Sequence, residues 1–110
     1  KAGQKVVISI QAASIDSKSQ QAAFDVIDPS GRKLVMVRTI PGLPAVYDLD
    51  VKADGEYLVR TYEYTHTSGS ADNTYRLTIS AAPWVDFVFP PAVEFGKASP
   101  VTVYGRNLPG

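Results

Sequence analysis

The residues that could perform catalysis are few. His66 is the only imidazole among the 110 residues and thus the only conventional general base near neutral pH. No serine lies in a Gly-x-Ser-x-Gly elbow, and the absence of cysteine excludes a thiol nucleophile and a Cys-based zinc site. Asp48 and Asp50 could form a carboxylate pair, but their spacing places them on the outward face of a strand, where acids keep a sheet soluble. We therefore expect no enzyme activity and no catalytic residue.

Metal binding by carboxylates is the second chemistry to consider. Calcium takes roughly six to eight oxygen ligands, several of them brought together on short loops. The candidate acids are scattered, and no Asp-x-Asp-x-Asp-Gly loop occurs. They are Asp16, Asp25, Asp28 and Asp72. For Asp28, as for Asp54, turn formation is the better interpretation. The expectation is no cofactor and no metal site, with a structural calcium ion as the alternative.

Three rings at regular spacing suggest ligand recognition. Tyr62, Tyr64 and His66 follow one another every second residue, so an extended chain would place them on one face. Rings on a sheet face can hold a sugar through contact with the apolar side of the pyranose and hydrogen bonds at its rim. Two interpretations stay open. The rings bind an extracellular glycan, or, as we prefer, they pack on hydrophobic stems or on a neighbouring domain.

The charges do not favour a polyanionic partner. Eleven basic and eleven acidic residues cancel, so no overall field would attract nucleic acid or an anionic membrane. Arg38, Arg60 and Arg76 would form a basic stripe only if their strands were neighbours. Cross-strand pairs, worth about a few tenths of a kcal/mol each, explain them adequately. The acids considered as partners are Asp48, Asp50 and Glu63. No apolar run approaches the ~18–20 residues of a membrane helix, so membrane insertion is not expected.

The elements that position these side chains are predicted to be strands. The chain is 45% hydrophobic and 20% charged, as a globular protein is and a disordered one is not. Apolar residues alternate with a period of two, and no 3.6-residue period is sustained. Turn signals such as Asp28-Pro29-Ser30-Gly31 and Asp54-Gly55 recur at intervals of roughly 8–12 residues. The predicted strands are residues 5–11, 22–27, 33–38, 45–51, 56–64 and 74–80.

Six such strands predict an all-β fold, an antiparallel, jelly-roll-like β-sandwich. Its interior is expected to lie between two layers of sheet. The residues expected to face it from the later strands are Tyr57, Val59, Tyr75, Leu77 and Ile79.

The composition changes after residue 82. The last 28 residues contain five of the eight prolines, namely Pro83, Pro90, Pro91, Pro100 and Pro109. Residues 84–89 and 99–104 are strand candidates, but two strands alone bury no core. This proline-rich β tail therefore packs on the first unit or opens a second domain. Trp84, at the boundary, is expected to lie between the two, and Trp84, Phe87 and Phe89 are the predicted interface residues.

Two parts of the chain resemble known families. The blocks Ala2-Gly3-Gln4-Lys5-Val6, 24–32, 54–60 and 75–79 resemble, in order and spacing, the bacterial pre-peptidase C-terminal (PPC) domain. Members of that family are jelly-roll-like sandwiches in secreted multidomain proteins. Phe89-Pro90-Pro91 and the segment Val101-Thr102-Val103-Tyr104-Gly105-Arg106-Asn107-Leu108 resemble the first hairpin of a TIG-type immunoglobulin-like domain.

The resemblance implies a non-catalytic accessory module outside the cytoplasm, secreted, periplasmic or on the cell surface. Residues 1–82 would be a PPC-like sandwich, and 83–110 a linker and the first hairpin of the next domain. The implied partners are neighbouring domains or another protein chain. The alternative is a carbohydrate-binding module attached to a secreted hydrolase. PPC domains usually carry a strand ahead of the Ala2-Gly3-Gln4 block, so a sheet edge is expected to be open to pairing.

Overall fold

The structure, a computed structural model, describes residues 1–12, 21–67, 69, 71 and 73–109. These residues form eight strands and no helix. No described segment therefore has the helical length and apolarity that a membrane crossing requires. The strands are β1 (Lys5–Gln11), β2 (Ala22–Ile27), β3 (Lys33–Arg38), β4 (Ala45–Asp50), β5 (Leu58–Glu63), β6 (Arg76–Ser80), β7 (Trp84–Phe89) and β8 (Thr102–Arg106).

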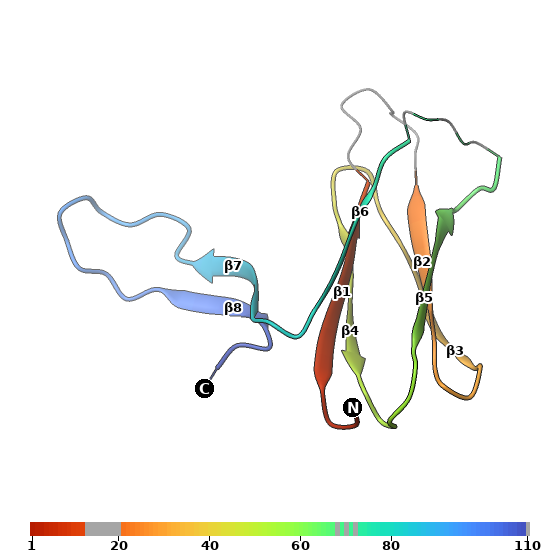
Figure 1. The fold of residues 1–110 in the computed structure, drawn as a ribbon. Helices are drawn as coiled ribbons and strands as arrows, with labels where there is room; N and C mark the ends of the chain where they lie inside the picture. The colour runs from red at the N-terminus through yellow and green to blue at the C-terminus, as the bar shows by residue number, and fades with distance from the viewer. Residues whose placement is uncertain (13–20, 68, 70, 72, 110) are drawn as a thin grey trace.

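The first six strands form two antiparallel sheets that lie face to face in a sandwich-like arrangement (Figure 1). One sheet has the order β4-β1-β6 and the other β3-β2-β5, so β1 and β2 are the central strands. We call β1–β6 the six-strand unit. Among the described strands, β7 and β8 pair only with each other, and they extend to one side of the six-strand unit (Figure 1). We call this pair the β7–β8 ribbon.

The core lies between the two central strands. Ile8 and Ile10 of β1 and Phe24 and Val26 of β2 belong to one cluster of buried side chains, because their alternation turns them toward the opposite sheet. Its other buried members are Ala22, Ala45, Leu49 and Val51. Partly buried residues that pack on it include Tyr57, Val59 and Leu77. The predicted inward orientation of these three is confirmed.

Two other residues predicted to face the interior are mostly exposed. Ile79 is 55% exposed and Tyr75 53% exposed. Ile79 stands opposite Ile8 in the register and thus projects from the core-facing side of its sheet. Because β6 is an edge strand, no described strand flanks this side chain beyond it. The predicted inward direction is correct for both, since the Tyr75 hydroxyl accepts a hydrogen bond from Thr61 Oγ1 of the other sheet at 3.1 Å. Burial does not follow from it, because Ile79 lies on an edge strand and Tyr75 just before that strand begins.

The predicted ends are correct for four strands, β1, β2, β3 and β7. β4 stops one residue earlier than predicted. β5 and β6 are shorter than predicted. β8 starts three residues later and ends two residues later than predicted. At β5 the missing residues lie between the strand and two residues with positive φ, Gly55 at 136° and His66 at 55°. The alternation of apolar and polar residues continues past the ends of the strand, so it overestimates the length of the strand.

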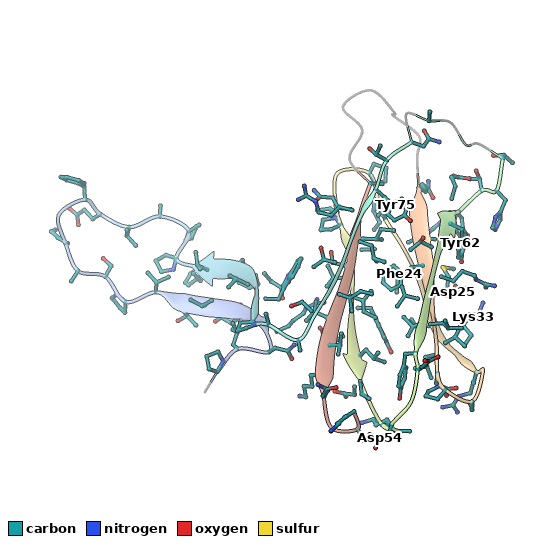
Figure 2. The ribbon with its side chains drawn as sticks, in the orientation of Figure 1. Phe24, Asp25, Lys33, Asp54, Tyr62 and Tyr75 are labelled. Carbon is teal, nitrogen blue, oxygen red and sulfur yellow. The ribbon has the colours of Figure 1, made fainter. Side chains whose placement is uncertain are left out.

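Acidic side chains support two turns at the same end of the six-strand unit. Asp28 Oδ1 accepts hydrogen bonds from the backbone nitrogens of Ser30 at 2.9 Å and Arg32 at 3.0 Å, as the turn signal predicts. Asp54 Oδ1 accepts one from the nitrogen of Ala2 at 2.7 Å. Figure 2 shows Asp54 at this end. Asp54 thus links the start of the chain to the β4–β5 turn, a contact beyond turn formation.

Gly55 allows the β4–β5 turn to pack on the β2–β3 turn. Its φ of 136° disfavours other residues, and an added Cβ would lie 2.8 Å from the Pro29 ring. We expect Gly55→Ala to lower the free energy of unfolding by about 1–2 kcal/mol. Gly42→Ala is the control, because Gly42 also has positive φ but open space around it. Urea unfolding of both variants should show the larger loss for Gly55→Ala, and equal losses would contradict the predicted clash.

Candidate functional site

The predicted ring cluster forms on the outer face of the β3-β2-β5 sheet. Tyr62 stands opposite Ala23 in the register, and Figure 2 shows its side chain on the side of the sheet away from Phe24. His66 lies in the turn after β5 and not on the strand, but its ring stacks on Tyr62 with centroids 5.1 Å apart and planes at 6°. Tyr64 is held at the strand end by its nitrogen, which donates to the oxygen of Gln21 at 2.8 Å.

A buried carboxylate lies at the centre of this face. Asp25 has a side chain only 1% exposed, and it accepts hydrogen bonds from Arg60 Nη2 and from the Tyr62 hydroxyl, the latter at 3.0 Å. Burial alone would raise the pKa of Asp25. The bonds from Arg60 and Tyr62, with the charge of Lys33 nearby, outweigh that effect and lower the pKa below its usual value. Asp25 is therefore ionised at neutral pH, with its charge compensated from within the fold.

Burial also acts on Tyr62. It raises the pKa of the Tyr62 hydroxyl, and the hydrogen bond to the Asp25 carboxylate raises it further. The hydroxyl therefore stays protonated at physiological pH and keeps donating to Asp25. The Tyr62 side chain is therefore held at two points, its ring by stacking with His66 and its hydroxyl by the hydrogen bond to Asp25.

Two arginines flank the buried acid from the neighbouring strands. Arg60 on β5 has its guanidinium carbon 5.9 Å from the Tyr62 centroid, and that of Arg38 on β3 lies 4.7 Å from the Tyr64 centroid. Such cation–π contacts orient a guanidinium without neutralising it. We define the outer-face cluster as Asp25, Lys33, Met36, Arg38, Arg60, Tyr62, Tyr64 and His66.

The acids predicted as arginine partners are engaged elsewhere. Asp48 pairs with Arg106 at 3.5 Å and Asp50 with Lys52 at 3.7 Å. Glu63 Oε2 accepts a hydrogen bond from Thr65 Oγ1 at 2.6 Å. Arg76 lies in the other sheet, opposite Gln11. The acids predicted as partners are therefore wrong, although Arg60 does form a cross-strand pair, with Asp25. This face carries Arg38 and Arg60, and the condition for a stripe of three arginines is not met.

The described residues bring together no group of three or more His, Asp or Glu side chains that could hold a metal ion. Asp25 already accepts from Arg60 and Tyr62, and Asp28 from its own turn. Of the other acids considered for calcium, Asp16 and Asp72 lie outside the described residues.

The β7–β8 ribbon is the second candidate site, and it is largely apolar and exposed. Phe87 is 57% and Phe89 62% exposed, and the Phe87 ring stacks on Tyr104 with centroids 4.7 Å apart. Trp84 is half-buried, and its indole nitrogen donates to Asp86 Oδ1 at 3.1 Å. Further exposed apolar residues of this part are Val85, Val88, Val93, Phe95, Val101 and Val103.

Polar contacts join the ribbon to the six-strand unit. Arg106 Nε lies 3.3 Å from Asp86 Oδ2 within the ribbon and 3.5 Å from Asp48 Oδ2 on β4. Asn107 Nδ2 donates to the backbone oxygen of Lys5 at 3.2 Å. The ribbon is therefore attached at its base while most of its apolar side chains stay exposed.

Comparison with protein-family models, curated proteins and solved structures gives no match for this chain.

Proposed function

We propose that the chain is a non-catalytic accessory module of a larger secreted or cell-envelope bacterial protein, acting in docking between domains or between proteins. The supporting observation is the β7–β8 ribbon. A two-stranded ribbon buries no core of its own, and large apolar side chains that gather at the surface mark a protein contact. Phe87 and Phe89 are the side chains that we expect a partner to cover.

The shape of the molecule supports this proposal. The Cα radius of gyration is 17.1 Å, against about 13 Å for a compact domain of 100 residues. The difference reflects the ribbon that projects from the six-strand unit (Figure 1). We propose that residues 1–82 form a jelly-roll-like, PPC-type sandwich and that 83–110 begin an immunoglobulin-like domain. The resemblance to PPC domains is also the reason for proposing an extracytoplasmic location.

Hydrogen exchange tests the docking role. We expect the amides of β7 and β8 to exchange about tenfold more slowly in the longer parent polypeptide than in the 110-residue chain, because a partner domain would bury the ribbon. The amides of β1 and β2, already in the core, serve as the internal control. Phe87→Ser in the parent polypeptide should reverse the protection. Equal exchange of β7 and β8 in both proteins would contradict the proposal.

A second function, carbohydrate binding beside a linked hydrolase, is favoured by one observation. Tyr62, Tyr64 and His66 lie with Arg38 on one outward face. An aromatic ring can contact the apolar side of a saccharide, and a guanidinium can donate hydrogen bonds to its oxygens.

A further inference from the structure

The rings of the outer-face cluster are largely engaged with one another. His66 stacks on one face of the Tyr62 ring, and the Tyr62 hydroxyl donates to Asp25. Arg38 lies over the Tyr64 ring. A neutral sugar could stack on the covered side of Tyr62 only by displacing His66. The groups that this surface presents to a ligand are therefore mainly its cations.

The solvent-facing charge of the cluster is positive. Lys33 and Arg38, the first and last residues of β3, form no ion pair within the described residues. Arg60 is 63% exposed although it pairs with Asp25. Asp25 is the one acid that the register places on this face of β2, β3 and β5. The charges of Asp25 and Arg60 largely offset each other, so the net positive charge of this face comes from Lys33 and Arg38, and Arg60 adds exposed hydrogen-bond donors.

We propose that the outer-face cluster binds an acidic polysaccharide, with Arg38 and Arg60 receiving its carboxylate or sulfate groups and Lys33 a further one. A guanidinium offers two parallel donors to such an oxyanion. Lys33 and Arg38 are five residues apart, roughly 17 Å along an extended strand. That span suits a polymer with repeated charges better than a single small anion. This inference rests on the second function above, since it specifies the class of glycan.

Because the net charge of the chain is zero, binding of a polyanion can be assigned to a local site. A protein without an overall field has no general attraction for polyanions, so binding must come from a local surface. Polygalacturonate, dextran sulfate, neutral dextran and a double-stranded DNA oligomer are the probes, titrated by NMR at low salt. We expect at least one acidic polysaccharide to shift the amides of Arg38, Arg60 and Tyr64, and neutral dextran to shift none. Raising the salt concentration should weaken the interaction.

Matched variants locate the site. Arg38→Gln should lower the affinity about tenfold through loss of a charge-assisted bond, and Lys33→Gln should lower it less. Arg76→Gln removes the same charge from the other sheet and should have no effect. Arg38 and Arg76 are both exposed, so the two arginine variants should have the same thermal unfolding midpoint as the natural chain when followed by circular dichroism.

Four results would overturn the inference. Equal weakening by Arg76→Gln, or equally tight binding of DNA, would show unspecific attraction between charges. Binding of neutral dextran alone would contradict the proposed preference for acidic polysaccharides but would still support carbohydrate binding. Failure to bind any saccharide would contradict both this inference and the second proposed function.

Discussion

Phe24→Ala should lower the free energy of unfolding by about 3–5 kcal/mol. Phe24 is the largest of the fully buried side chains and belongs to the cluster that contains Ile8 and Ile10 of the other sheet. Figure 2 shows it between the two sheets. Alanine at this position leaves a cavity that both sheets line, because neither central strand can move without breaking its ladders. The free energy of unfolding of a native domain is about 5–15 kcal/mol in total, so this variant would lose a large part of its stability.

Urea unfolding followed by far-ultraviolet circular dichroism measures this loss, with an unchanged dependence on urea expected. Phe95→Ala makes the same chemical change at a fully exposed position and should alter stability by no more than about 0.5 kcal/mol. Similar small losses in both variants would mean that the sheets share no common core.

Local periodicity was sufficient for the strands and for the central core. Ile8 and Phe24 are buried where alternation places them, because both strands are flanked on each side within their sheets. The same rule gave the inward direction of Ile79 but not its exposure on the edge strand β6. Which strand lies at the edge is a property of the whole sheet order and not of any short segment. The resemblances to PPC and TIG-type domains stay predictions.

Alternation also placed Tyr62 and Tyr64 outward, as observed, but Asp25 was missed as the centre of their face. An acid in the middle of the otherwise apolar Ala22–Ile27 strand was the available signal. Its partners Arg60 and Tyr62 come 35 and 37 residues later. Only the register of β2 against β5 brings them together, and no sequence period records that register. The same holds for Arg106 and Asp48, which join the ribbon to β4.

Asp25→Asn should lower the free energy of unfolding by about 2–3 kcal/mol at pH 7. Asparagine keeps the shape of the side chain but removes the charge that Arg60 pairs with, and its amide group must face one of two donors. Asp50→Asn is the control, because the Asp50 side chain is 58% exposed and pairs only with Lys52 among the described residues. Its loss should stay within about 0.5 kcal/mol.

The pH dependence separates the charge of Asp25 from its packing. The pKa of Asp25 is lower in the folded chain than its usual value of 3.8, so the folded state favours the ionised form. The resulting stabilisation is fully present above pH 3.8 and is lost as the pH falls through the lower folded-state pKa. The difference in unfolding free energy between the natural chain and Asp25→Asn should therefore be constant from pH 7 to about pH 5 and shrink toward pH 2. A difference that persists undiminished at pH 2 would show that packing and not charge holds the outer-face cluster together.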